Sequence, residues 1–259
     1  MAAHSLIKGL IVGSGLLAAA VQASSGDHRL NARDNGGYRP EPQGHFVCVE
    51  QHKIVKGTVL YRLNLETGDN PAVNENVGPG GNINAIGYNI LDNYLYGFVA
   101  VSGGRWQLIQ IDAEGGHQLL PTVDRFYSTG DIDANGQLWI GASGTTAWAQ
   151  IDLDPDSART AAHTSTRLPG RPQLALFAGP SRERWTEVRD YGNVTPAAPQ
   201  FGALYAVGDE MWGSDNASGK IIAFPVLDDN APARDISAGP PSNSNDGARC
   251  FAAPAPSNR

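Results

Sequence analysis

The acidic stretch Asp131-Ile132-Asp133-Ala134-Asn135-Gly136 is the segment of this chain whose residue types and spacing come nearest to a metal-binding loop. Alternating oxygen side chains followed by a glycine turn can wrap a hard cation such as calcium. The twelfth position of the helix-flanked version would be Ala142, where that version needs a bidentate Glu. Since Asn-Gly is the strongest short hairpin signal, we interpret Asn135-Gly136 as a hairpin turn, with a calcium site as the alternative.

A second candidate site involves Asn84, Asp131 and Asp246, which occupy similar places in the segments NAIGY, GDIDA and NDGAR. If these segments are equivalent inner strands, the three side chains could hold a cation that polarises a carbonyl or phosphoryl oxygen and activates water. Alternatively, they cap strand ends and accept hydrogen bonds from the backbone of neighbouring repeats. No Glu or His joins the set, so we favour capping and expect no cofactor, with calcium as the exception.

Other catalytic arrangements are missing from the sequence. The six His residues show neither metal-ligand spacing nor an HExxH pattern, and no G-x-S-x-G nucleophile elbow occurs. The formal net charge is −7, which argues against a nucleic-acid partner or an anionic membrane surface, because both attract concentrated Lys and Arg.

Residues 1–23 have the features of an export signal. Lys8 precedes an apolar run over 9–21, and Val21-Gln22-Ala23 fits a small-residue cleavage pattern. This run is shorter than the roughly 20 residues of a membrane span but suits a signal-peptide core. We predict a secreted, extracellular protein without a membrane span, in which residues 24–45 form a flexible lead-in too polar to offset the entropy of ordering.

The remaining chain is organised as repeats of short strands. Hairpin-like segments recur at 82–97, 129–142 and 201–214, and in truncated form at 245–251. Asn84 and Asp131, which match one another, are 47 residues apart. Periods in the forties with three or four short strands are typical of a β-propeller, whose blades are four-stranded sheets. Whole antiparallel hairpins within each period favour this all-β fold over a solenoid or a sandwich.

The two ends of the repeat region are predicted to share one blade. The C-terminal NDGARCF begins a repeat that has nothing after it, whereas HFVCVEQ and VLYRLNL continue a repeat that has nothing before it. This arrangement places Cys250 on the innermost strand and Cys48 on the strand beside it, close enough for a disulfide if their registers match. Export to an oxidising compartment favours the bond.

One period has an irregular length. Gly130 and Gly202 are 72 residues apart, too far for one blade and too close for two, and only outer-type strands occur between Leu153 and Phe201. We therefore predict a β-propeller-like domain over 46–254, followed by a tail at 255–259. It has nominally five blades: the shared blade, then 83–123, 129–165, a truncated fourth blade at 171–192, and 201–238.

Several motifs between residues 84 and 250 carry a family resemblance. They are NAIGYN with DNYLYG, TGDIDANGQLW, RWTEVRDYGNV, and the series FGALY, GSDNASGKI and SNDGARC. Together they resemble a family of exported propeller-like domains of unknown function, found in fungal and bacterial secreted proteins. The resemblance implies the propeller fold and lends no chemistry. The family's aromatic-rich hairpin before RDYGNV is missing after Gln173, at the truncated blade.

Surface features complete the functional hypothesis. Asn193 and Asn216 fit the N-glycosylation pattern of an exported chain, and Pro196 makes the first site less favourable. The five Trp residues are expected to pack mostly between blades, with a sugar-stacking surface as the alternative. We expect a non-enzymatic extracellular binding or surface module for a glycan or a protein. The alternative is a metal-dependent hydrolase or lactonase acting at the channel mouth.

Overall fold

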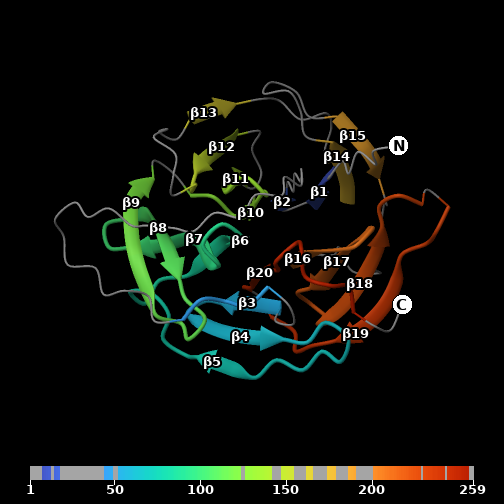
Figure 1. The fold of residues 1–259 in the computed structure, drawn as a ribbon, viewed down its shortest axis with the longest axis horizontal. Helices are drawn as coiled ribbons and strands as arrows, with labels where there is room; N and C mark the ends of the chain where they lie inside the picture. The colour runs from blue at the N-terminus through green and yellow to red at the C-terminus, as the bar shows by residue number, and fades with distance from the viewer. Residues whose placement is uncertain are drawn as a thin grey trace.

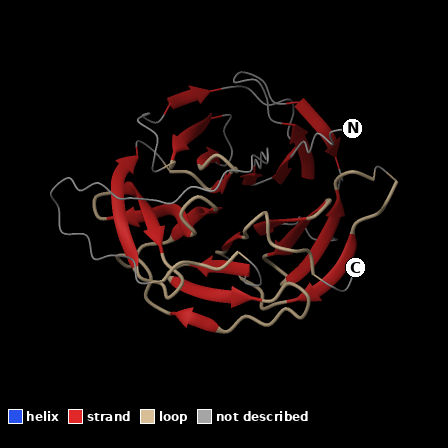
Figure 2. Cartoon of the chain, in the orientation of Figure 1, coloured by secondary structure: helices blue, strands red, loops and turns tan. Residues whose placement is uncertain are grey.

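Five four-stranded antiparallel sheets surround a common centre in the computed structural model, as the blades of a β-propeller (Figure 1). The structure describes residues 8–12, 15–17, 44–48, 52–123, 126–141, 147–154, 162–165, 174–178, 186–190, 201–228, 230–242 and 244–256. All regular secondary structure in these ranges consists of β-strands (Figure 2), so the predicted all-β propeller class is confirmed. No helix within them is long and apolar enough to cross a membrane.

Blade 1 joins the two ends of the repeat region, as the sequence predicted. Its strands, from the centre outward, are β20 (Asp246–Ala248), β3 (His52–Lys56), β4 (Val59–Leu63) and β5 (Ala72–Asn74). Cys48 and Cys250 form a disulfide with their Cα atoms 5.4 Å apart. The bond is the predicted one, but both cysteines lie just outside the paired strands, because β20 ends at Ala248, opposite Lys53.

Blades 2, 3 and 5 each consist of four consecutive strands, over the predicted ranges 83–123, 129–165 and 201–238. Blade 2 contains β6 (Ile83–Asn89), β7 (Tyr94–Val101), β8 (Arg105–Ile111) and β9 (His117–Val123). Blade 3 contains β10 (Thr129–Ile132), β11 (Gln137–Gly141), β12 (Ala147–Asp152) and β13 (Ala162–Ser165). Blade 5 contains β16 (Phe201–Val207), β17 (Glu210–Asp215), β18 (Lys220–Pro225) and β19 (Arg234–Ala238). Short turns join the strands of each inner hairpin, which explains the recurring turn signals in the sequence.

Blade 4 is assembled from two distant parts of the chain. The segment that the sequence identified as truncated supplies β14 (Leu174–Ala178) and β15 (Thr186–Asp190). The two inner strands are β1 (Lys8–Val12) and β2 (Gly15–Leu17), and β1 pairs with β14 along its whole length. Both strands fall within the predicted leader, so cleavage after residue 23, which stays a prediction, would take two strands out of this blade.

The innermost strands of the blades form a ring in which each contacts the next, in the order β2, β10, β6, β20, β16 and back to β2. Glycines allow this close approach: a Cβ on Gly130 would lie 2.8 Å from the carbonyl oxygen of Ala85, and one on Gly247 would lie 2.6 Å from the Cβ of Ala203. The ring therefore brings the first residues of several inner strands side by side.

Apolar side chains fill the spaces between neighbouring blades. One buried cluster joins blades 1 and 2, a second joins blades 2 and 3, and a third joins blades 5 and 1. Trp212 is fully buried in the third cluster and donates its indole N–H to Glu210. Trp212 therefore has the interblade packing that the sequence predicted for most of the Trp residues, and blades 1, 2, 3 and 5 bury apolar surface against a neighbour.

Candidate functional site

Asp246 connects the inner strands of blades 1 and 2. Its side chain is 3% exposed. One carboxylate oxygen accepts the N–H of Ile86 at 2.9 Å, and the other accepts the N–H of Gly247 at 2.8 Å. A buried carboxylate that accepts backbone N–H groups across a blade boundary acts as a cap for the neighbouring strand. This geometry matches the capping role that we favoured for Asp246.

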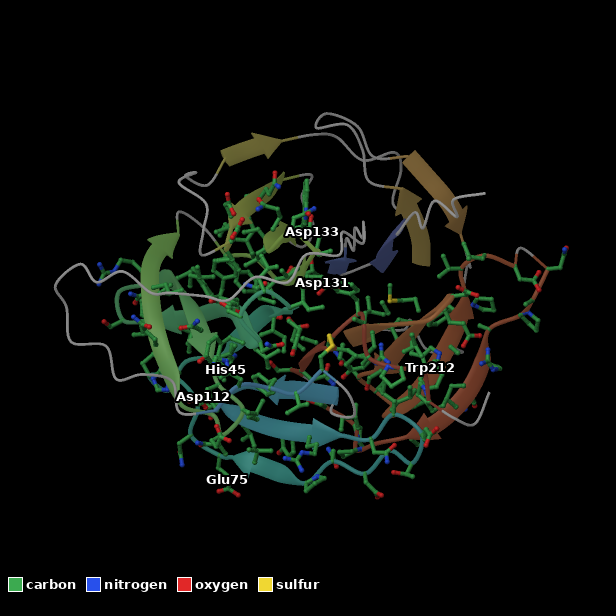
Figure 3. The ribbon with its side chains drawn as sticks, in the orientation of Figure 1. His45, Glu75, Asp112, Asp131, Asp133 and Trp212 are labelled. Atoms are coloured by element: carbon green, nitrogen blue, oxygen red, sulfur yellow. A yellow bond between two sulfur atoms is a disulfide. The ribbon has the colours of Figure 1, made fainter. Side chains whose placement is uncertain are left out.

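Asn84 and Asp131 lie on the inner strands of the next two blades, where each caps its own strand. Asn84 Oδ1 accepts the N–H of Ala85 at 3.0 Å, and Asp131 Oδ1 accepts the N–H of Ile132 at 2.8 Å. Ala85 has a φ of +54° and lies at a bulge of β6, so the Asn84 bond supports a strained backbone conformation. Figure 3 shows Asp131 beside the centre of the ring.

Burial changes the protonation of the two acidic residues in the ring. Burial, opposed by the hydrogen bond from the N–H of Ile132 and aided by the charge of Asp133, raises the pKa of Asp131 to about 7. Burial also raises the pKa of Asp246 well above its ordinary value, although the N–H of Ile86 opposes this change and the charge of Asp131 adds to it. Both carboxyl groups are therefore close enough to interact, and both favour the neutral form.

We expect the protein to melt at a higher temperature near pH 5 than near pH 8. Because the folded pKa of Asp131 is raised from 3.8 to about 7, its contribution to stability is complete below the unfolded pKa and is lost as the pH rises through the folded pKa. Asp246 acts in the same direction. Each pKa unit between the folded and unfolded states changes the free energy of unfolding by at most about 1.4 kcal/mol.

Thermal unfolding of the parent and of Asp131→Asn at both pH values measures this effect. The variant cannot ionise at position 131, so its melting temperature should change less with pH. Equal melting temperatures of the parent at the two pH values, or an increase towards pH 8, would contradict the assignment.

Asp133 and Asn135 lie in the turn between β10 and β11, away from Asp246. Asp133 Oδ1 accepts the N–H groups of Asn135 and Gln137, at 2.9 and 3.0 Å, and Oδ2 accepts the indole N–H of Trp139 at 3.0 Å. Gly136 completes the turn with a φ of +70°, a conformation that glycine adopts without strain. The DIDANG stretch therefore has the geometry of a hairpin turn.

The five proposed calcium ligands do not form one set. Asn84, Asp131 and Asp246 belong to the inner ring, whereas Asp133 and Asn135 belong to the β10–β11 turn. Within the described ranges, no group of three or more His, Cys, Asp or Glu residues is arranged to hold a metal ion. Calcium binding by these five residues stays a prediction.

The structure describes only one of the two Asn residues that fit the glycosylation pattern. Asn193 lies outside the described residues. Asn216 lies in the predicted turn, between β17 and β18, but its side-chain oxygen is buried without a hydrogen-bond partner. Its amide would have to turn outward to carry a glycan, and glycosylation stays a prediction at both positions.

An aromatic pair at the outer part of blade 2 joins the exposed Phe126 to Trp106, which is partly buried against the core between blades 2 and 3. Sugar stacking was the alternative for the Trp residues, whereas sequence reasoning did not single out Phe126. The rings of Trp106 and Phe126 have their centroids 4.3 Å apart at an interplanar angle of 39°, and Phe126 is 38% exposed. The next residue, Tyr127, is buried and packs its ring 5.5 Å from that of Phe98. Tyr127 therefore anchors the backbone that presents Phe126 to solvent.

A family model described as a repeat of unknown function (DUF6923) matches residues 48–179 of this chain. A comparison with curated proteins found no match.

Several solved structures are similar in fold. A catalytically inactive virginiamycin B lyase from Staphylococcus aureus, crystallised with quinupristin, is 16% identical with a TM-score of 0.39, and the match covers 70% of this chain and 63% of the lyase. A putative 6-phosphogluconolactonase from Bacteroides uniformis is 16% identical with a TM-score of 0.41, covering 73% and 68%. The Cps50 (Swd1) β-propeller domain from Myceliophteria thermophila is 10% identical with a TM-score of 0.41, covering 82% and 93%.

Proposed function

The chain belongs to the DUF6923 family of repeats of unknown function, and we propose that it is a non-enzymatic extracellular binding module whose ligand is a glycan. The observation that carries this proposal is the ring contact between Trp106, which is partly buried, and Phe126, which is 38% exposed. Aromatic faces that remain accessible offer the apolar C–H surface of a sugar ring a stacking partner, and Trp combines such a face with an N–H donor.

The inner ring supports binding over hydrolysis. The oxygens of Asn84, Asp131 and Asp246 accept backbone N–H groups, so these side chains already have a structural task. A hydrolase needs a nucleophile or an activated water with a positioned base. Asp131 and Asp246 have raised pKa values, which would suit a general base near neutral pH, but their oxygens already accept backbone N–H groups. The hydrolase or lactonase alternative therefore has weaker support.

An extracellular setting is part of this proposal. The Cys48–Cys250 disulfide fits an oxidising compartment. The leader-like residues 1–23 provide the route in this proposal.

Glycan-array binding by the purified full chain tests the proposal, followed by titration of the best ligand. We expect Phe126→Ala and Trp106→Ala each to weaken binding about tenfold, equivalent to about 1.4 kcal/mol, because each removes one face of the pair. Leu227→Ala is a matched control, since Leu227 is 61% exposed on blade 5, and it should bind like the parent.

Two results would overturn the proposal. One is glycan binding that survives both aromatic substitutions. The other is turnover of a lactone or phosphoester substrate that disappears in Asp131→Asn. Capture of a protein ligand with no glycan binding would reject the glycan as the ligand.

A further inference from the structure

The start of the inner strand of blade 5 packs against buried side-chain oxygens. Gly202 is the second residue of β16, as Asn84 is of β6, so this blade lacks a side chain where blade 2 has a polar one. A Cβ on Gly202 would lie 1.8 Å from Asn245 Oδ1 and 2.4 Å from Asn216 Oδ1. Two amide oxygens from different segments therefore converge on the backbone of Gly202.

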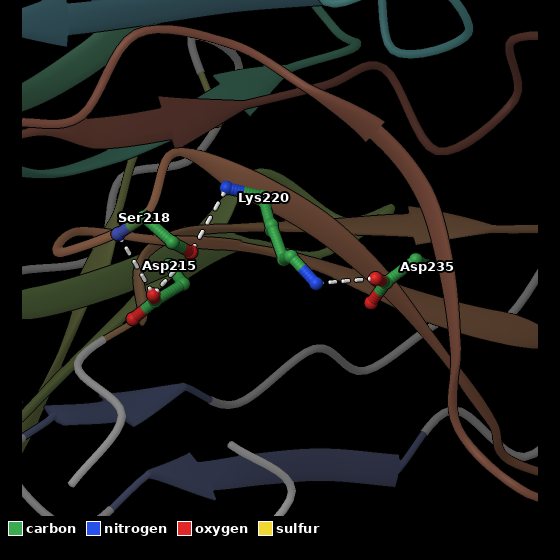
Figure 4. Close-up of polar contacts among 4 residues, drawn as sticks. All are labelled: Asp215, Ser218, Lys220 and Asp235. Carbon is green, nitrogen blue, oxygen red and sulfur yellow. Dashed lines mark hydrogen bonds and ion pairs between the residues drawn. The ribbon is translucent and has the colours of Figure 1, made fainter. Parts of the chain in front are cut away.

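These oxygens lack hydrogen-bond partners. Asn216 Oδ1, Asn245 Oδ1 and Asp215 Oδ1 are all buried and unpartnered, and the residues Asp215 and Asn245 are only 4% and 9% exposed. The other oxygen of Asp215 accepts the N–H of Ser218 at 3.0 Å and its O–H at 2.6 Å (Figure 4). Buried acceptors without a donor are unfavourable, and two amide oxygens that face one another are stabilised either by a positive group between them or by rotation of one amide, which turns its N–H groups toward the other oxygen.

No protein cation fills this role among the described side chains. Lys220, the nearest lysine along the chain, extends away from Asp215 and pairs with Asp235 at 2.5 Å (Figure 4). Ion pairs to Asp215 are not found within the described ranges. The negative charge of this turn is therefore not balanced by a neighbouring Lys or Arg.

Backbone hydrogen bonds hold the turn and the loop that carry the three oxygens. Gly219 donates its N–H to the carbonyl oxygen of Asp215, which closes the β17–β18 turn, and Ser242 donates its N–H to the carbonyl oxygen of Asn216. The second bond joins the turn to the loop that carries Asn245 and leads into β20. A ligand bound to these oxygens would consequently connect blade 5 with the innermost strand of blade 1.

We propose that the side-chain oxygens of Asp215, Asn216 and Asn245 bind an oxygen-seeking cation of the calcium class above Gly202. Carboxylate and amide oxygens are the ligands that hard cations prefer, and water completes their coordination. The bound cation stabilises the closure of the ring between the first and last blades. It also holds the amide of Asn216 inward, so that cation binding and glycosylation at Asn216 exclude one another.

Calcium binding by the full, disulfide-bonded chain tests the proposal, with protein produced without N-glycans. Calorimetric titration with calcium chloride and native mass spectrometry should show one calcium ion per chain, and thermal unfolding should occur at a higher temperature in calcium than in EDTA. Asn245→Ala should abolish this binding. Asn76→Ala, a matched change at an exposed position of the loop after β5, should leave it unchanged.

Asn245→Asp separates a cation site from a structural hydrogen-bond network. The added carboxylate should tighten calcium binding about tenfold or more, because affinity rises with ligand charge. Without calcium, the same variant should melt below the parent, because a second buried charge then lacks compensation. A cation site therefore predicts that Asn245→Asp melts above the parent in calcium and below it without calcium. A structural hydrogen-bond network does not predict this reversal.

Several outcomes would overturn the proposal. They are the absence of calcium binding by the folded parent at millimolar calcium, unchanged binding in Asn245→Ala, and an Asn245→Asp variant that melts below the parent in both conditions. A crystal structure grown in calcium that shows a water molecule, or a direct hydrogen bond between the two amides, would overturn it as well. None of these outcomes affects the glycan assay at Trp106 and Phe126.

Discussion

Replacing both Cys48 and Cys250 with serine is expected to lower the free energy of unfolding by about 5 kcal/mol. The two residues are 202 positions apart in the sequence, so the bond restrains nearly the whole domain in its unfolded state. In the chain-entropy model the stabilisation grows with the logarithm of loop length, and a loop of this size gives a value near the upper end of the range. The bond also joins the two chain segments that build blade 1.

Urea unfolding of the oxidised parent and of the double serine variant measures this difference. Adding reductant to the parent should reproduce the loss, whereas reductant should not change the variant. A loss below about 1 kcal/mol would mean that strand pairing within blade 1 closes the ring without help from the bond.

The second large effect is expected at Arg249, where replacement by methionine should cost about 3 to 5 kcal/mol, because each buried acceptor left without a donor costs about 1 to 3 kcal/mol. Arg249 is only 6% exposed. Its guanidinium donates to four carbonyl oxygens, and hydrogen bonds from a charged group are worth about 1.5 to 3 kcal/mol each before the cost of burying the charge is subtracted. The acceptors are Ala206 at 2.7 Å, Cys250 at 3.3 Å, Ala253 at 2.9 Å and Pro254 at 2.7 Å.

Methionine fills a similar volume but leaves these carbonyl groups without donors. Ala206 belongs to blade 5, whereas Ala253 and Pro254 belong to the C-terminal segment, so Arg249 joins the last blade to the end of the chain. The substitution should therefore loosen both attachments. Its cost should not add simply to that of the cysteine changes, because Arg249 and Cys250 are neighbours.

Arg234→Met is the matched control for this prediction. Arg234 is 41% exposed and forms an ion pair with Glu210, whose side chain is 13% exposed and also accepts the indole N–H of Trp212, so loss of this one pair should cost less than loss of four buried contacts. Urea unfolding should show a clearly larger loss for Arg249→Met than for Arg234→Met. Equal losses would show that the four buried contacts do not contribute net stability.

The overall architecture was predictable because its signals are local and repeated. An inner hairpin such as 83–101 has a turn flanked by β-forming residues, and the same pattern returns at nearly constant intervals. A constant period requires each unit to bury its apolar surface against the next one, which favours a propeller. The incomplete repeats at the two ends complement one another, so the shared blade and the Cys48–Cys250 bond were also within reach of the sequence.

The composition of blade 4 could not be predicted in this way. The run at 8–12 has the composition of a signal-peptide core, and nothing in its residues indicates that it pairs with 174–178. Strand pairing over such a separation depends on which edge the rest of the fold leaves available, and a local pattern does not contain that information.

The tertiary structure also decided which polar side chains meet. The sequence determined the turn at Asn135-Gly136 and the equivalence of Asn84 with Asp131, because both follow from local spacing. It did not determine that Asn216 and Asn245 converge above Gly202, since these residues come from a turn, a loop and a strand of different repeats. Side chains from separate segments are brought together by blade packing and ring closure, whose geometry depends on long-range contacts.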